Sequence, residues 1–193
     1  MTVDIPQAGI EILFEVAEVR DSVTALGRRI AAELGAEDPL LVALVGGSVI
    51  FLADLVRALE IPVRYELIDV TYRADRAGRA EPASPADGEE PAEVLRIEYP
   101  IPIALAGQSV LVLKDVVSSG VTAPYLEQQL RDHGAREVRF AALIDMPDER
   151  KTAFGLHYSA LTTHRHGLLV GYGLKHQGRY GNLPYVGRLS DGD

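Results

Sequence analysis

The chain has 193 residues, of which 47% are hydrophobic and 24% are charged, and it contains no cysteine. This length is typical of one domain, and we expect residues 1–193 to form a single domain around one apolar core. The lack of cysteine excludes disulfide bonds, thiolate nucleophiles and cysteine-ligated zinc. The net charge of −9 argues against a nucleic-acid partner, because neutralising the phosphates of a nucleic acid requires clustered lysine and arginine.

The apolar runs of the sequence bear on where the protein works. Residues Met1–Ile10 lack the basic segment and the apolar run of a secretory signal. No apolar stretch approaches the roughly 20 residues that are needed to span a bilayer. We therefore expect a cytoplasmic protein without a membrane partner.

The first third of the chain predicts helices and strands in alternation. Apolar residues at helical spacing predict a helix over Ile10–Leu34, and the pattern allows a break near Asp21-Ser22. Pro39–Val45 is a short, continuously apolar run, which is typical of a strand that is covered on both faces in a parallel sheet. Ser48–Leu59 is a predicted helix with Ser48 as its cap, and Ile61–Val70 is a predicted strand.

A long polar segment follows, over residues 72–92. It holds three prolines, two glycines and many charges, with few apolar residues. A loop of this length in a compact domain is usually functional or mobile. Since Val94–Tyr99 predicts a short strand on its far side, we expect the loop to form the tip of a hairpin.

The second half of the chain continues the alternation. Ser109–Val117 has the strongest strand pattern, and a predicted helix follows from about Ala123 to His133. Glu137–Ile144 and Leu168–Tyr172 are two further predicted strands. Strands that alternate with helices are typical of βαβ units, so the sequence predicts an α/β fold with a mostly parallel sheet.

The segment Lys114–Thr122 has the features of a phosphate-binding turn. A buried strand ends in two charged residues, turns through Ser118-Ser119-Gly120 and enters a helix. Backbone N–H groups at such a turn are unpaired, and the helix dipole adds positive potential. Gly120 allows a ligand to approach closely, while the serine and threonine hydroxyls offer further donors. A phosphate monoester would fit this turn; an ordinary strand-to-helix connection with a serine cap is the alternative.

Several segments resemble the type I phosphoribosyltransferases, and in particular their hypoxanthine-guanine branch. Val110–Thr122 resembles the motif that binds phosphoribosyl pyrophosphate. Asp38–Gly47 is similar to the first strand with its pyrophosphate loop, and Phe51–Leu55 to the helix that follows. Ala142–Pro147 is similar to the base-side strand, and Leu169–Leu174 together with Arg179–Val186 to the C-terminal signature. They occur in the family's order over most of the chain.

The resemblance implies a fold and a reaction. The fold would be a twisted, largely parallel sheet flanked by helices, with a small hood formed by the N-terminal and C-terminal segments. The ligand would lie above the carboxyl ends of the strands. The family displaces pyrophosphate from phosphoribosyl pyrophosphate with a purine ring nitrogen, while Mg²⁺ neutralises the leaving group. Family members commonly form oligomers, so we expect a homo-oligomer.

The resemblance also implies roles for individual residues. Asp115 matches an acidic residue that holds the ribose hydroxyls, and Ser118 stands where the family has its general base. The residues implied to bind phosphate or phosphoribosyl pyrophosphate are Lys114, Asp115, Ser118, Ser119, Gly120, Val121, Thr122, Gly46 and Gly47. Those implied to bind the base are Met146, Leu168 and Leu169. Thr71 and Tyr72 match the closing lid; a tyrosine at a strand end is the equal alternative for Tyr72.

Several of these positions depart from the family pattern. Ser118 replaces the general-base aspartate, and Met146 replaces the lysine that recognises the purine. The other departures are Val45 for a lysine beside the pyrophosphate-loop glycines, Lys114 for an acid, Leu168 for an aromatic ring, Lys175 for an aspartate that contacts magnesium, and Gly181 for an arginine that contacts pyrophosphate. The phosphate loop is kept, whereas the groups that recognise the base and the magnesium pyrophosphate are lost.

Two hypotheses about function follow. The first is a purine-salvage enzyme that transfers phosphoribosyl to hypoxanthine or guanine, or to a changed acceptor. The second is a degenerate homologue that binds a phosphoribosyl compound or nucleoside monophosphate in a regulatory or partner role. Lys114 and Lys175 either replace the charge of magnesium, with Asp115 as the one candidate ligand, or extend into solvent.

Three smaller features complete the predicted site and its surroundings. His164-Arg165-His166 places two imidazoles at alternate positions, which suits either a metal site or a base-side loop at the surface. Asp148–Lys151 is predicted to be a solvated turn. Tyr172 and Tyr185 are predicted to be core or interface rings.

Overall fold

The computed structural model describes residues 9–73, 94–98 and 105–189, with the backbone alone for 70–73 and 94–98. The helices are α1 (Val16–Leu34), α2 (Ser48–Ala58) and α3 (Thr122–Asp132), with short 3-10 turns η1 (Gly35–Glu37) and η2 (Pro147–Glu149). The strands are β1 (Ile10–Phe14), β2 (Leu40–Leu44), β3 (Arg64–Arg73), β4 (Val94–Glu98), β5 (Ser109–Val117), β6 (Glu137–Asp145), β7 (Tyr158–Thr162), β8 (Leu169–Val170) and β9 (Val186–Leu189).

The central sheet has the strand order β4-β3-β2-β5-β6-β7. Strands β3 to β7 in this order run parallel, and β4 pairs antiparallel with β3 at one edge. The predicted mostly parallel sheet is confirmed. β5 lies in the middle, so its carboxyl end opens at the centre of the sheet edge.

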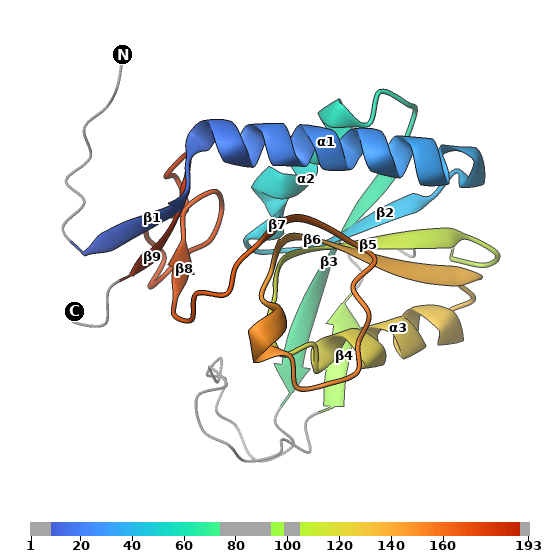
Figure 1. Ribbon diagram of the computed structural model, residues 1–193. Coiled ribbons are helices and arrows are strands. Elements are labelled where there is room, and N and C mark those ends of the chain that lie inside the picture. The colour runs from blue at the N-terminus through green and yellow to red at the C-terminus, as the bar shows by residue number, and fades with distance from the viewer. Residues whose placement is uncertain (1–8, 74–93, 99–104, 190–193) are drawn as a thin grey trace.

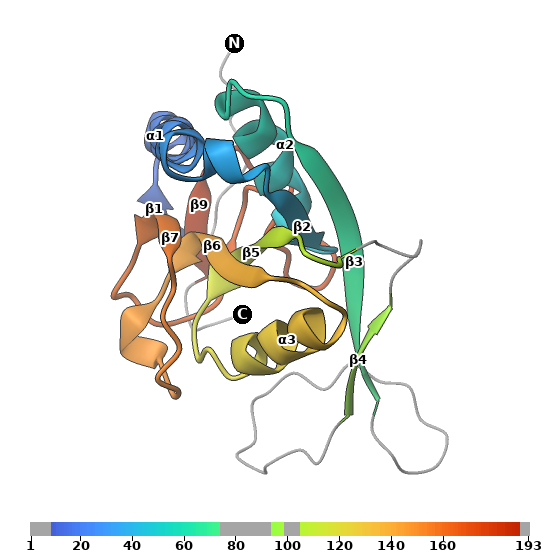
Figure 2. The same cartoon turned by 90° about the vertical axis from the view of Figure 1, so that its right-hand side faces the viewer.

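Helices cover both faces of this sheet (Figure 2). α1 and α2 pack on one face, against Leu111 and Leu113 of β5, while α3 packs on the other face, against Val110 and Val112. The strand therefore buries both sets of alternating side chains, which explains its continuous apolar run. Gly27 brings α1 and α2 close together, because a Cβ there would lie 2.6 Å from Cβ of Ala58.

A second sheet, with the order β1-β9-β8, forms the predicted hood from both ends of the described chain (Figure 1). Ile10 pairs with Leu189 across β1 and β9. The predicted helix over Ile10–Leu34 is therefore wrong at its start: residues Ile10–Phe14 are extended, and α1 begins at Val16. The apolar spacing crosses this boundary without a change, so the pairing with a distant strand decides where the helix begins. α1 then continues through Asp21-Ser22 without a break.

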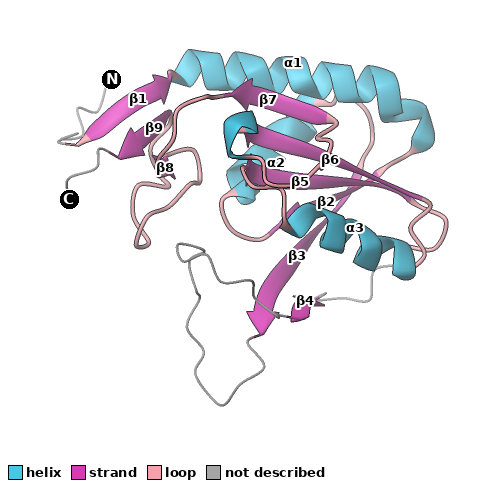
Figure 3. Cartoon of the chain, turned by 60° about the horizontal axis from the view of Figure 1, so that its bottom comes forward, coloured by secondary structure: helices cyan, strands magenta, loops and turns pink. Residues whose placement is uncertain are grey.

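Other predicted elements need smaller corrections. Ser48 does not cap α2: its hydroxyl donates a hydrogen bond to the carbonyl of Leu44, and Gly47 occupies the cap position. β7 and β9 were not predicted, because their sequences are short and mixed in polarity. The predicted hairpin is confirmed, since Tyr72 pairs with Leu95 across β3 and β4 (Figure 3). The loop predicted over residues 72–92 begins later than expected, because Tyr72 and Arg73 still belong to β3, and residues 74–92 lie outside the described part of the chain.

Candidate functional site

The turn between β5 and α3 has an open row of backbone donors. Within the described residues, the amides of Ser119, Gly120 and Thr122 donate to no partner, and that of Val121 reaches only Oγ of Ser119, at 3.5 Å. Gly120 adopts a φ of +75°, which an L side chain rarely adopts. This conformation turns the chain sharply into α3. No side chain caps the helix, so the serine-cap alternative does not account for the turn.

The opposite side of this turn is held by the segment after η2. The amide of Lys151 donates to the carbonyl of Ser119 at 2.9 Å. A Cβ on Gly120 would lie 2.8 Å from Oγ1 of Thr152 and 3.0 Å from Cδ of Arg150. The prediction of a solvated turn over Asp148–Lys151 is wrong for Arg150, whose side chain is 15% exposed and forms an ion pair with Asp145. The sequence held no signal for this contact, because Arg150 stands among charged neighbours and its burial is a tertiary event.

The two charged residues at the end of β5 lie on opposite faces of the sheet. Asp115 faces the loop after β2, since a Cβ on Gly47 would overlap its carboxylate. Its Oδ1 accepts a hydrogen bond from the amide of Val116 at 2.8 Å. Lys114 follows Val110 and Val112 on the α3 face, and burial lowers the pKa of its ammonium while neighbouring Asp115 partly restores it. Lys114 is half-buried, so of the two alternatives its position agrees less with a side chain that extends freely into solvent.

The C-terminal segment touches the same loop. A Cβ on Gly173 would overlap the carbonyl oxygen of Gly47, so the two backbones pass directly against each other. Lys175 is exposed, and its Cγ lies 2.9 Å from the Cβ that Gly181 lacks. The fold thus brings Gly47 and the backbone that carries Lys175 together from distant parts of the sequence.

The predicted base-binding residues differ in their exposure. Met146 is 4% exposed and belongs to the apolar core beneath α1 and α2. Leu169 is also buried, whereas Leu168 is 44% exposed. Asp145 is the last residue of β6 and Met146 follows it. The amide of Met146 donates to the carbonyl of Val117 at 2.9 Å, so this segment lies beside the end of β5.

The two histidines at alternate positions both reach η2. Nδ1 of His164 lies 2.9 Å from Oδ2 of Asp148, and Nδ1 of His166 lies 3.2 Å from Oε1 of Glu149. All these contacts are at the surface. Each histidine engages its own carboxylate, which favours the surface-loop interpretation over a shared metal site.

The side chains around the end of β5 decide whether the protein could hold a Mg²⁺ ion. The described residues contain no group of three or more histidine, aspartate or glutamate side chains that could hold a metal ion. Mg²⁺ prefers carboxylate and phosphate oxygens, but Asp115 is preceded here by Lys114, and the segment that touches the Gly47 loop carries Lys175. The donor set does not fit a protein-held magnesium ion.

Three further observations concern other parts of the molecule. An open groove of about 620 Å³ between α1, α2 and the C-terminal segment is lined by Val16, Ile50 and Pro184 among others, and none of the predicted site residues lines it. No helix in the described ranges is both long and apolar enough to cross a membrane. Of the predicted lid, the backbones of Thr71 and Tyr72 lie in β3, opposite Arg96 and Leu95.

Comparison with known proteins places this geometry among enzymes of nucleotide metabolism. The family model "Phosphoribosyl transferase domain" matches residues 12–160. The hypoxanthine-guanine phosphoribosyltransferase of Mycobacterium avium is 30% identical over 185 residues, which cover 92% of this chain and 84% of that protein. Its counterpart in Bacillus subtilis (strain 168) is 26% identical over 179 residues, which cover 93% and 92%. The bifunctional protein TilS/HprT of Listeria innocua is 27% identical over 179 residues, but this chain spans only 26% of its length.

Solved structures share the fold. A hypoxanthine phosphoribosyltransferase from Staphylococcus aureus matches with a TM-score of 0.80 at 22% identity, over 93% of this chain and 91% of that chain. The hypoxanthine phosphoribosyl transferase of Trypanosoma cruzi matches with a TM-score of 0.79 at 24% identity, over 98% and 94%. These proteins therefore share the overall fold of this chain.

Proposed function

Because this chain belongs to the type I phosphoribosyltransferases, in their hypoxanthine-guanine branch, we propose that it binds phosphoribosyl pyrophosphate and transfers phosphoribosyl to a purine in cytoplasmic purine salvage. The observation that carries the proposal is the open row of amides at Ser119–Thr122, at the carboxyl end of the central strand. Unpaired amides at a helix N-terminus favour a phosphate group. The relatives' names support the choice of hypoxanthine or guanine as acceptor.

The proposed reaction assigns a part to each side of the site. The amides of Ser119–Thr122 bind the 5′-phosphate, and the Asp115 carboxylate accepts hydrogen bonds from the ribose hydroxyls. The purine nitrogen forms its bond to C1 as the bond from C1 to the pyrophosphate oxygen breaks, and the purine's proton passes to the released pyrophosphate. Positioning and electrostatic stabilisation supply most of the catalysis in such a reaction.

In this proposal, the charge that balances pyrophosphate comes from lysines. Lys114 is a partly desolvated ammonium beside Asp115, and Lys175 lies over Gly181 in the segment that faces the Gly47 loop. An ammonium shielded from water interacts with an anion more strongly than an exposed one does.

Calorimetry with pyrophosphate, with and without Mg²⁺, tests whether lysines balance the charge of pyrophosphate: binding that requires the metal would contradict this. Lys114→Met should weaken binding more than Lys175→Met.

A second candidate function is binding without turnover, in a regulatory or partner role. Two observations favour it. Ser118, at the position of the family's general base, has no activating partner within hydrogen-bonding reach in the described residues, so nothing there accepts the purine's proton. Met146, at the position of the lysine that recognises the purine, is buried. In this case a nucleoside monophosphate would occupy the site as a ligand.

One assay separates the two functions. The protein is incubated with phosphoribosyl pyrophosphate and hypoxanthine, guanine, xanthine or adenine in turn, with and without Mg²⁺, and pyrophosphate release is measured. Release with a 6-oxopurine supports the enzyme. Tight binding of a nucleoside monophosphate without release supports the second function.

A restoration experiment tests the missing general base. Ser118 lies on the open turn, so Ser118→Asp should be tolerated and should raise any transfer activity, because a carboxylate can accept the purine's proton. Met146→Lys places an ammonium in the apolar core and should lower stability. An inactive but folded Ser118→Asp protein would indicate that further parts of the site are lost.

We also propose that the protein is a homo-oligomer. Val45, Val49 and Ile50 expose apolar surface beside the Gly47 loop. Light scattering across a concentration series tests this, and a monomer at all concentrations would contradict it.

A further inference from the structure

Arg150 lies against the turn that opens toward the proposed phosphate, on its opposite side. Its Nη2 forms the ion pair with Oδ1 of Asp145, and its guanidinium carbon lies 5.7 Å from the ring centre of Phe154. Its Cδ lies 3.0 Å from the position where Gly120 would carry a Cβ. The side chain is therefore held between the base-side strand and the phosphate turn.

Two polar atoms at this place have no partner. Nη1 of Arg150 and Oγ1 of Thr152 are both buried, and neither makes a hydrogen bond within the described residues. The Thr152 hydroxyl lies 2.8 Å from the same missing Cβ of Gly120. Buried polar groups nearly always have partners, and a spare donor on a buried cation is especially unfavourable. An anion bound at the turn would reduce the electrostatic part of this cost.

We propose that Arg150 is a positioning residue of the phosphate site, which supports the Ser118–Thr122 turn and stabilises the anion bound to its open amides. The inference rests on the proposed function. Asp145 orients the guanidinium by engaging Nη2, and Nη1 remains uncommitted. In a site shielded from water, this cation acts on a phosphate more strongly than an exposed arginine would.

The experiment uses ribose 5-phosphate as the probe, with calorimetry on the full chain. Arg150→Met should weaken binding by about 10- to 100-fold, as expected for the loss of a charge-assisted contact. Arg150→Lys keeps the charge and should recover part of this loss. Arg131→Met is the matched control, because Arg131 pairs with Glu127 near the far end of α3 and should leave binding unchanged.

A second readout distinguishes an electrostatic role from mechanical support. In ³¹P NMR, the second pKa of the bound phosphate, ordinarily about 6, should lie lower in the wild-type protein and rise in Arg150→Met. A purely structural role would not move this pKa in protein that remains folded. If Arg150→Met does not fold, Arg150→Gln carries the same expectation, because its amide can still donate to Asp145.

The outcomes separate this inference from the function on which it rests. No binding of ribose 5-phosphate by the wild-type protein would overturn the phosphate site and the role of Arg150 together. Binding by the wild type and by folded Arg150→Met within about twofold, with the same phosphate pKa, would overturn the role of Arg150 alone.

Discussion

Gly120 shows how one residue without a side chain can determine the shape of a turn, here the one that we propose binds phosphate. Two separate costs oppose any side chain there: its φ of +75° and the atoms of Thr152 and Arg150 that lie behind it. Gly178 has the same φ of +75°, but nothing lies within 4 Å of its missing Cβ. Comparing substitutions at Gly120 and Gly178 therefore separates the cost of backbone strain from the cost of crowding.

We expect Gly178→Ala to lower the free energy of unfolding by roughly 1 kcal/mol, from backbone strain alone. Gly120→Ala should lower it by roughly 2–4 kcal/mol, because crowding adds to the strain. It should also abolish binding of ribose 5-phosphate. Urea unfolding and calorimetry on both variants measure these effects. Equal destabilisation of the two variants would show that the side chains of Thr152 and Arg150 can move aside for the added methyl group without a loss of stability.

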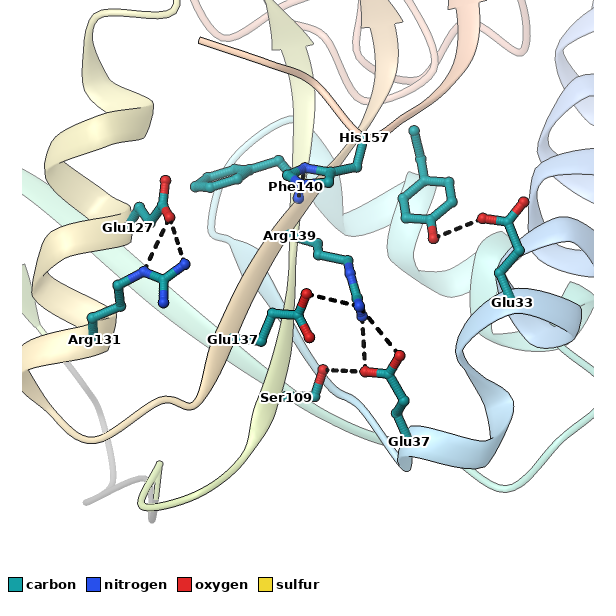
Figure 4. A network of polar contacts seen from close by, with 10 residues as sticks. Glu33, Glu37, Ser109, Glu127, Arg131, Glu137, Arg139, Phe140 and His157 are labelled. Carbon is teal, nitrogen blue, oxygen red and sulfur yellow. Dashed lines mark hydrogen bonds and ion pairs between the residues drawn. The ribbon is translucent and has the colours of Figure 1, made fainter.

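At the scale of elements, a charged network joins the amino ends of β5 and β6 to the turn after α1, at the end of the sheet remote from the phosphate turn (Figure 4). Arg139 contacts both carboxylate oxygens of Glu37, at 2.9 and 3.2 Å, and Ser109 donates to the same carboxylate at 3.0 Å. Arg139 also pairs with Glu137 at 2.7 Å. The network links segments that are 72 to 102 residues apart along the chain.

The Glu37 contacts predict a dependence of stability on pH. Hydrogen bonding by Arg139 holds the pKa of Glu37 below its ordinary 4.5, and Ser109 adds to this. Below pH 4.5 the unfolded chain therefore binds more protons than the folded one, so stability that is present above pH 4.5 is lost as the pH falls. Glu37→Gln should cost about 1–3 kcal/mol at pH 7 and should flatten this dependence.

Glu127→Gln is the control for that experiment. Glu127 pairs with Arg131 one helical turn away on α3, near the surface. Its loss should cost roughly 0.5 kcal/mol or less. Urea unfolding at pH 7 and pH 4 compares the variants, and a loss of equal size in both would contradict the special position of Glu37.

At the scale of the whole molecule, the segment between β8 and β9 of the hood is tied to α2 through a buried tyrosine. The hydroxyl of Tyr172 donates to Oδ2 of Asp54 at 2.6 Å, and burial together with Asp54 raises the pKa of this phenol well above 10. Tyr185 is buried in the same part of the molecule, but its hydroxyl has no partner within the described residues. The predicted burial of both rings is confirmed, and the two tyrosines form a natural pair.

Tyr172→Phe should lower the free energy of unfolding by about 1–2 kcal/mol, because Asp54 loses a donor. It should also speed amide hydrogen exchange in the C-terminal segment. Tyr185→Phe should be neutral or stabilising, because it removes an unpaired hydroxyl from a buried site. Thermal unfolding and hydrogen exchange measure both. A larger loss in Tyr185→Phe would show that its hydroxyl has a partner in solution.

Much of the architecture could be predicted from local sequence. The apolar runs of β2, β5 and β6, the helices that follow two of them and the phosphate turn all have patterns within about ten residues. β1 could not, because Ile10–Phe14 carries the same apolar spacing as the helix after it, and only pairing with β9 at the other end of the chain makes it a strand. Arg150 could not either, since its neighbours Asp148, Glu149 and Lys151 are as polar as it is.

The sequence by itself determined the mostly parallel sheet and the place of the glycine turn between β5 and α3, because strand burial, glycine and the entry to a helix are local properties. Only the tertiary structure decided which charges lie inside. Lys114 is half-buried at the end of β5, Lys175 stays exposed, and the side chain of Arg150 is largely shielded against Gly120. The reason is that burial of a charged side chain depends on what distant segments place around it, and its own sequence neighbourhood does not encode this.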